Sequence, residues 1–142
     1  AVEAIREVLL PIATVVTPNI PEASALTGIE IRDIDMAKEA AMELVNMGAA
    51  AAVVKGGHMF DVPASDILYD GSEFRVFTTK RINTLNTHGT GCTFASAISA
   101  QLAKGDTVRE AVSHAKAYVT GAIINGLNIG SGHGPLNHFY RS

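Results

Sequence analysis

Short apolar runs alternate along this chain with longer segments in which apolar residues recur at helical spacing. Residues 13–17 and 50–54 are continuous runs of Ala, Val and Thr, a pattern typical of buried strands. Between them, an amphipathic segment begins at Asp33 or Asp35 and ends at Met47, which predicts a helix. Since two strands joined through a helix pair in parallel, this order predicts an α/β fold with a parallel sheet covered by helices.

Other helices are recognised by their ends and their spacing. Residues 1–10 place apolar side chains on one helical face, and Pro11 ends that pattern. Residues 19–28 predict a short helix that Asn opens and Gly closes, and residues 93–103 predict a helix of small residues. Residues 107–125 begin with a capping box and predict a long helix. The apolar faces are Val2, Ile5, Val8 and Leu9 in the first helix; Met36, Ala40, Leu44 and Met47 in the helix that ends at Met47; and Val108, Ala111, Val112, Ala115, Val119 and Ala122 in the last.

The middle and the end of the chain have a different character. Residues 65–69 and 74–78 are apolar runs that flank Asp70-Gly71, which is a signal for a β-hairpin. The tail from residue 130 to residue 142 is rich in Gly and His and contains a proline, so we expect a loop there. The chain shows no internal repeat and no linker.

Composition narrows the class of protein. With 142 residues, 47% hydrophobic and 18% charged, the chain is the length of one domain and is too apolar to be disordered. So few charges also suggest that some apolar surface meets another chain or a further part of the protein. A net charge of −3 without a basic run argues against nucleic acid, and no apolar run is long enough for a membrane span. A single cysteine, Cys92, excludes an internal disulfide and favours the cytoplasm.

The densest cluster of candidate residues lies where a strand is followed by the helix of small residues. Residues 86–92 bring two Thr, two Gly, an Asn, a His and Cys92 to one helix start. Glycines there let backbone N–H groups approach an anion, and the helix N-terminus favours a phosphate and a thiolate. A plain turn before a closely packed helix, with Cys92 as a small core residue, is the alternative. It explains the small residues that follow but not the convergence of these polar groups.

Four segments together resemble one enzyme family. Residues 86–93 are similar almost letter for letter to the anion-hole signature of the hydroxymethylpyrimidine/phosphomethylpyrimidine kinases of thiamine biosynthesis, in the ribokinase-like superfamily. Residues 17–23, 53–58 and 132–138 resemble further motifs of that family in the same order. The likeness covers the whole chain but only the C-terminal half of the family. It implies a three-layer α/β/α fold with a mainly parallel sheet, of which residues 1–142 are an incomplete C-terminal portion.

The resemblance also implies an activity and roles for residues. The family uses ATP and Mg²⁺ to phosphorylate 4-amino-5-hydroxymethyl-2-methylpyrimidine and then its monophosphate. Cys92 would accept the hydroxyl proton, and backbone N–H groups would stabilise the transferring phosphoryl group. The implied catalytic residues are Gly89, Thr90, Gly91 and Cys92; the implied nucleotide-binding residues are Lys55, Gly57, Asn86 and Thr87; and the implied residues near the metal are Asn19 and Glu22.

Two of these groups also have structural explanations. Asn19 and Glu22 have the spacing of a capping box, and Pro21 suits an early helical position, so the residues alone favour a helix cap. The family adds a second role, in which an Asn-x-x-Glu motif organises Mg²⁺ and phosphate through water. Lys55 and Gly57 lie where a predicted parallel strand ends, which is where α/β sheets bind ligands. An ordinary strand-to-loop turn with a solvated lysine explains them equally well.

Several alternatives stay open. Most ribokinase-like enzymes have Asp where this chain has Cys92 and Asn86; the pyrimidine kinases share both departures, but related pyridoxal kinases share the cysteine. A hydrolase that pairs Cys92 with His88 fits the residue types but has poor spacing across a helix start. His133 and His138 match no zinc spacing, so we expect them to be surface residues. A pyrimidine-binding module without turnover is the non-enzymatic alternative.

The resemblance completes the set of expectations. Since the family's N-terminal half holds much of the pyrimidine pocket, residues 1–142 alone are expected to lack kinase activity. The expected partner is a small pyrimidine substrate, with no nucleic acid and no membrane, and the longer chain leaves room for a homodimer.

Overall fold

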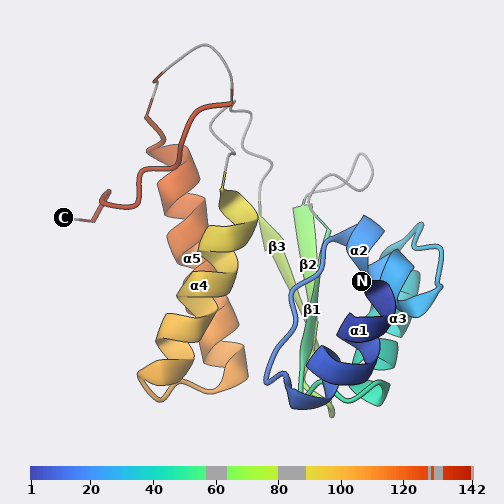
Figure 1. Ribbon diagram of the computed structural model, residues 1–142. Helices are drawn as coiled ribbons and strands as arrows, with labels where there is room; N and C mark the ends of the chain where they lie inside the picture. Colours follow the sequence, from blue (N-terminus) through green and yellow to red (C-terminus); the bar gives the residue numbers. More distant parts are fainter. Residues whose placement is uncertain (57–63, 80–88, 128, 130–132, 142) are drawn as a thin grey trace. The chain divides into compact units, whose positions relative to one another are not determined.

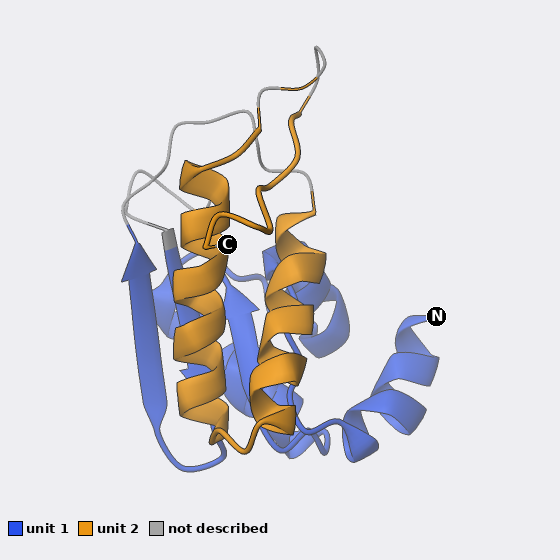
Figure 2. Ribbon diagram, turned by 90° about the vertical axis from the view of Figure 1, so that its left-hand side faces the viewer, with its two compact units in different colours: residues 1–80 blue, residues 81–142 orange. Residues whose placement is uncertain are grey.

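The computed structural model describes residues 1–56, 64–79, 89–127, 129 and 133–141. The chain folds into two compact units, residues 1–80 and residues 81–142, which Figure 2 shows in different colours. Each unit contains buried apolar residues of its own. We predicted that residues 1–142 form part of one domain. That depends on how the two units combine, so it stays a prediction.

The first unit opens with a helical stretch that changes geometry twice. α1 (Val2–Ala4) continues as a π-helix, η1 (Ile5–Leu9), and then as a 3-10 turn, η2 (Leu10–Ile12). The prediction that Pro11 ends the helix is therefore wrong by one residue. Pro11 is tolerated because it stands near the start of the 3-10 turn, where its missing amide hydrogen is not needed.

The apolar face of this stretch differs from the predicted one. Leu10 is fully buried and Ile5 packs against the core of the unit. Val2, Val8 and Leu9, by contrast, are 38%, 66% and 51% exposed, so the predicted face is wrong at these three positions. The reason is geometric: a π-helix has a longer turn than an α-helix, so residues after Ile5 rotate away from the positions that an α-helical period assigns to them.

The sheet contains three strands in the order β1-β2-β3, which are β1 (Ala52–Lys55), β2 (Ala64–Tyr69) and β3 (Phe74–Thr79). Neighbouring strands are antiparallel, with Val54 opposite Ile67 and Ile67 opposite Val76. The predicted hairpin at Asp70-Gly71 is confirmed: Asp70 accepts hydrogen bonds from the backbone of Ser72 and Glu73, and Gly71 has a φ of 89°.

The strand predicted at residues 13–17 is an extended segment rather than a strand. It pairs with β1 through two isolated parallel bridges, Val16 with Ala52 and Asn19 with Lys55. The predicted parallel pairing of these two segments is thus confirmed. The three described strands do not form the mainly parallel sheet that the sequence predicts. A parallel pair needs a crossover of about a dozen residues, and the links that follow β1 and β2 are shorter.

Two helices lie along one face of this sheet (Figure 1). α2 (Ile20–Thr27) ends at Gly28, which has a left-handed φ of 77°, and α3 (Ile34–Asn46) begins at the predicted cap Asp33. Asp33 accepts a hydrogen bond from the Met36 N–H. The predicted face of α3 is confirmed at Ala40 and Leu44, while Met36 and Met47 lie at its margin. The core of the unit comprises Leu10, Ala23, Leu26, Ile31, Ala37, Ala40, Ala41, Leu44, Ala49, Ala52, Val54 and Ile67.

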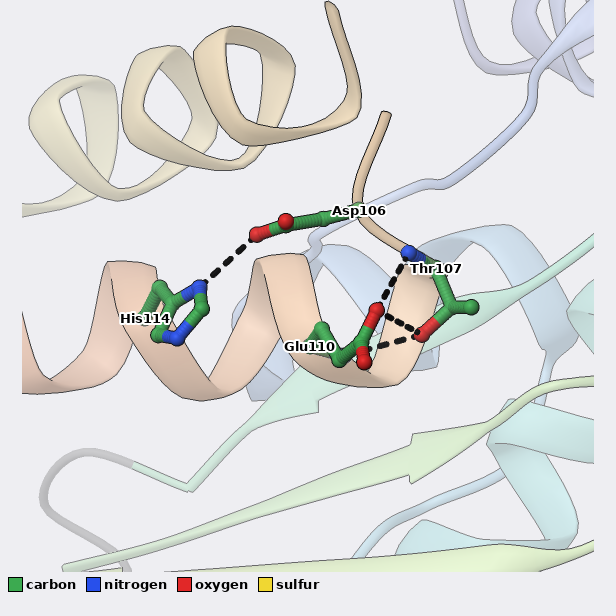
Figure 3. Close-up of polar contacts among 4 residues, drawn as sticks. All are labelled: Asp106, Thr107, Glu110 and His114. Carbon is green, nitrogen blue, oxygen red and sulfur yellow. Dashed lines mark hydrogen bonds and ion pairs between the residues drawn. The ribbon is translucent and has the colours of Figure 1, made fainter. Parts of the chain in front are cut away.

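The second unit is built on two helices that pack side by side, α4 (Thr90–Ala103) and α5 (Val108–Ile124) (Figure 2). α5 agrees with the predicted residues 107–125 to within one residue at each end, while α4 ends at Ala103 as predicted but begins at Thr90, three residues before the predicted start. The predicted capping box at the start of α5 is present between Thr107 and Glu110 (Figure 3). Five of the six residues predicted to be buried in α5 are buried, and Val108 is half-buried. No helix among the described residues is both long and apolar enough to cross a membrane.

Candidate functional site

The cap of α2 combines two of the predicted site residues. The Asn19 N–H donates to Glu22 Oε2 at 2.8 Å, and the Glu22 N–H donates to Asn19 Oδ1 at 2.9 Å. This is the reciprocal capping box expected from the sequence, and it fixes both side chains at the start of the helix. Glu22 is exposed, and the cap engages Oε2 of its carboxylate, which leaves Oε1, a hard oxygen donor, outside the cap.

Lys55 belongs to the same corner of the first unit. It is the last residue of β1, its N–H donates to the Pro18 carbonyl at 2.9 Å, and it pairs with Asn19 across a parallel bridge. The segment that precedes α2 and the end of β1 are therefore adjacent, as the sequence predicts for carboxyl ends of parallel segments. Gly57, the other predicted residue of this motif, lies outside the described residues.

Gly56 shows a structural reason for its lack of a side chain. A Cβ at Gly56 would overlap with the backbone carbonyl oxygen of Ser65 in β2. The Gly56 N–H also donates to Oδ1 of Asp66 at 3.1 Å, and Asp66 is only 6% exposed. Asp66 escaped the sequence analysis, in which it was one polar residue in a predicted strand. Its signal in the sequence is a carboxylate followed by apolar residues in a predicted strand, and the structure pairs it with Lys55 at the end of β1.

The second group of predicted residues forms the start of α4. Gly89 has a left-handed φ of 82°, and Thr90, Gly91 and Cys92 are the first three helical residues. The Thr93 N–H closes the first turn on the Gly89 carbonyl at 2.9 Å. Cys92 is exposed, so its reading as a small core residue is wrong. Backbone N–H groups at the first positions of a helix have no partner within it and point toward an anion site.

Two predicted residues of this motif, Asn86 and Thr87, lie outside the described residues, as does His88. The expected nucleotide contacts of Asn86 and Thr87, and the alternative pair of Cys92 with His88, therefore stay predictions. The residues near α2 and those at the start of α4 fall in different compact units.

A groove runs along the second unit and begins beside Cys92. Its volume is about 860 Å³, within the range of small-molecule sites, and the described residues that line it belong to α4, to Lys104 just after it, to α5 and to the tail. Its described lining holds two basic residues and two histidines and no carboxylate. The polar residues of this lining include Cys92, Thr93, Tyr118 and His138.

His138 is therefore more than a surface histidine of the tail. Its Nε2 lies 3.0 Å from Oγ1 of Thr93, and its carbonyl accepts a hydrogen bond from the Tyr118 hydroxyl at 2.9 Å. His138 is exposed, as expected, and both it and Thr93 belong to segments that resemble family motifs, but the sequence assigned no contact to His138, Thr93 or Tyr118. A histidine that follows Pro and Asn in a Gly-rich tail carries no periodic signal, so only the fold identifies its partners.

A metal site made of protein ligands alone is not present among the described residues, which contain no cluster of three or more His, Cys, Asp or Glu side chains suited to a metal ion. Oε1 of Glu22, which the cap does not use, fits a different arrangement, in which a hydrated Mg²⁺ is held mainly by phosphate oxygens and water.

Comparisons with known proteins agree on one family. A family model described as phosphomethylpyrimidine kinase matches residues 1–137. The hydroxymethylpyrimidine/phosphomethylpyrimidine kinase of Bacillus subtilis is 50% identical over 140 residues, which are 98% of this chain and 52% of the relative. The thiamine biosynthesis bifunctional protein of Geobacter sulfurreducens is 51% identical over 138 residues, 97% of this chain and 28% of the relative. This chain thus spans about half of the first relative's length and less of the second.

The fold also recurs in solved kinases. The pyridoxal kinase from Staphylococcus aureus, in complex with AMP-PCP, matches with a TM-score of 0.94 at 41% identity, over 99% of this chain and 52% of that one. The ribokinase-like α/β fold expected from the sequence is therefore confirmed.

Proposed function

This chain belongs to the phosphomethylpyrimidine kinase family, and from that premise we propose that the protein transfers a phosphoryl group from ATP to a hydroxymethylpyrimidine. The first acceptor is the alcohol of 4-amino-5-hydroxymethyl-2-methylpyrimidine, and the second is the phosphate of the resulting monophosphate. Both reactions serve thiamine biosynthesis, the process that names the Geobacter relative. The pyrimidine is a small soluble molecule, and the reaction needs neither nucleic acid nor a membrane.

One observation supports this proposal above the others, which is the geometry at the start of α4. Gly89 turns the backbone into the helix, and Cys92 stands exposed in the first turn. N–H groups of Gly91 and Cys92 stabilise negative charge that develops on the transferring phosphoryl oxygens. The Cys92 thiolate accepts the proton of the substrate hydroxyl as the oxygen attacks phosphorus. This part of the chain thus supplies both a charge-stabilising cradle and a base within one helical turn.

The corner beside α2 holds the nucleotide phosphates in the proposal. Lys55 lies at the end of β1, next to the cap of α2, and presents a cation to the phosphates. Gly57, Asn86 and Thr87 complete the proposed nucleotide contacts. Mg²⁺, when bound, neutralises phosphate charge. Glu22 orients it through water with its Oε1, while Asn19 fixes the Glu22 carboxylate through the cap.

An ADP-release assay tests the proposal directly. The protein, in the length of its relatives, is given ATP and Mg²⁺ with the hydroxymethylpyrimidine, with its monophosphate, or with no acceptor. We expect ADP release that depends on each pyrimidine, and phosphorylated products in matching amounts. ADP release without any acceptor contradicts the proposal. Binding of the pyrimidine without ADP release also contradicts it and favours a non-catalytic binding module, whereas alkylation-sensitive hydrolysis that is indifferent to ATP favours the cysteine hydrolase.

Pyridoxal phosphorylation is the second candidate, because the Staphylococcus aureus neighbour is named as a pyridoxal kinase and matches 99% of this chain. The same base and the same cradle serve either alcohol. The match of the phosphomethylpyrimidine kinase family model to residues 1–137 and the curated relatives named as pyrimidine kinases favour the pyrimidine. A kcat/KM for pyridoxal above that for the hydroxymethylpyrimidine in the same assay reverses the order of the two candidates.

A further inference from the structure

The tail of the chain is fastened across α4 and α5 by contacts that involve both its backbone and its side chains. The Asn137 N–H donates to the Ala122 carbonyl at 3.1 Å, and the Tyr118 hydroxyl donates to the His138 carbonyl at 2.9 Å. The Tyr140 ring packs against the Tyr118 ring with centroids 5.8 Å apart. These contacts hold the main chain of residues 137–140 on α5, so the direction of the His138 side chain is set by the fold.

That side chain reaches from the tail to the first turn of α4. Nε2 of His138 lies 3.0 Å from Oγ1 of Thr93, at a sequence separation of 45 residues. Thr93 is the residue whose N–H closes the first turn on Gly89, and it follows Cys92 directly. The hydrogen bond therefore ties the tail to the turn that carries the exposed thiol. Cys92, Thr93 and His138 also line the same groove.

We propose that His138 is a positioning residue for phosphoryl transfer, which acts through Thr93 to hold the first turn of α4 in its reactive geometry. The inference rests on the proposed function, because it assigns the turn to catalysis. A displacement of about 1 Å at a catalytic group can lower a rate on the order of 10²-fold, so a single contact at this turn has a large effect on rate. His138 touches neither the transferred phosphoryl group nor the acceptor in this proposal; it orders the residue beside the base.

Cys92 itself offers a readout that does not depend on kinase activity. It is the only cysteine of this chain, so iodoacetamide modifies a single thiol and the alkylation rate reports on one site. The first turn of α4 sets the direction of the Cys92 side chain and keeps its thiol exposed to the reagent. Loss of the His138 contact should therefore slow alkylation at neutral pH. The other titratable or charged groups that line the groove, Lys104, His114, Tyr118 and Arg141, remain in every variant.

The test compares four variants. His138→Ala removes the contact, and His138→Gln places an amide nitrogen close to where Nε2 stands, so it should restore much of the effect. Thr93→Val removes the partner hydroxyl at nearly constant volume. His133→Ala is the matched control, since His133 is an exposed histidine of the same tail.

In the length of the relatives, His138→Ala and Thr93→Val should lower kcat about tenfold and leave KM for the pyrimidine within about twofold. In the 142-residue chain, both should slow Cys92 alkylation severalfold, whereas His133→Ala should change neither quantity.

Unchanged or faster alkylation in both His138→Ala and Thr93→Val overturns the positioning role, whatever happens to kcat. If His138→Ala does not fold, Thr93→Val decides alone by the same criterion. Slower alkylation with an unchanged kcat supports the contact and its effect on the turn, but contradicts the proposed role of Cys92 as base. The failure of the inference and the failure of the proposed function are thus distinguishable.

Discussion

Cys92 combines two properties that suit it to chemistry: it stands in the first turn of a helix, and its side chain is exposed. We predict that Cys92→Ala, in the length of the relatives, lowers kcat by about 10²–10⁴-fold, the usual loss when a general base is removed. ATP affinity should change little, because the backbone cradle remains. Steady-state kinetics and nucleotide titration measure the two quantities. A kcat within a few-fold of the unmodified protein would assign the proton transfer to another group.

Gly56 illustrates a glycine that is required by its own backbone neighbours. A Cβ there would overlap with the Ser65 carbonyl oxygen, and that oxygen cannot turn away as a side chain would. We predict that Gly56→Ala lowers the free energy of unfolding by about 2–3 kcal/mol, in the range of overpacked sites. Circular dichroism during urea unfolding measures it.

Gly28→Ala is the matched control for Gly56. Gly28 has a left-handed φ of 77° but no atom within 4 Å of the added Cβ, so only backbone strain opposes the change. It should cost about 1 kcal/mol. Equal effects of the two substitutions would mean that the approach of β2 to Gly56 is relaxed at little cost, and that its absent side chain serves a ligand instead.

The start of α5 shows how a helix end responds to pH. Glu110 accepts hydrogen bonds from the N–H and the hydroxyl of Thr107, both at 2.9 Å (Figure 3). The backbone hydrogen bond from Thr107, and then the hydroxyl bond, lower the pKa of Glu110 from its ordinary value of 4.5. A lowered pKa in the folded state means that the carboxylate stabilises the fold at pH values above 4.5, and that this contribution is lost as the pH falls through the folded-state pKa.

We therefore predict that Glu110→Gln is less stable than the unmodified chain at neutral pH and that the difference narrows as the pH falls below 4.5. The amide keeps the size of the side chain but cannot carry the charge. Urea midpoints at a series of pH values measure the difference. Thr107→Ala, which removes the cap hydroxyl, should lower stability by about 1 kcal/mol at neutral pH. A difference between Glu110→Gln and the unmodified chain that stays constant down to pH about 3 contradicts the linkage.

At the scale of the whole molecule, the chain exposes large apolar side chains and matches only part of its relatives. Val8, Ile12 and Phe139 are 66%, 77% and 79% exposed, and the chain covers 52% of the Bacillus subtilis relative. The composition predicts apolar surface that meets another chain or a further part of the protein; this stays a prediction, and these three exposed residues are the candidates for it.

We predict that the 142-residue chain alone shows no pyrimidine-dependent ADP release. Catalysis of phosphoryl transfer depends on holding acceptor and donor in line. This chain covers 52% of the Bacillus subtilis relative, so we expect it to lack part of the contacts that hold the two substrates. The assay described for the proposed function measures this, with the same protein in the length of its relatives as the positive control. Robust turnover by the 142-residue chain would place the whole acceptor site within it.

Features that depend on neighbouring residues were predictable from the sequence. Both capping boxes, at Asn19 and at Thr107, are present as expected, because a cap joins residues three apart and needs no distant partner. The hairpin at Asp70-Gly71 follows from the same local logic. The placement of Cys92 in the first turn of α4 was predicted as well, since glycines and helical spacing mark the boundary.

Features that depend on distant residues were decided only by the tertiary structure. The antiparallel pairing of β1 with β2 depends on which edge is available, and the close approach of Ser65 to Gly56 depends on that pairing. The contact of His138 with Thr93 joins residues 45 apart in the sequence. Periodicity and spacing report which face of an element is apolar, but a hydrogen bond between two single polar groups leaves no period. Such a bond forms only after the packing of α4, α5 and the tail has brought the two groups together.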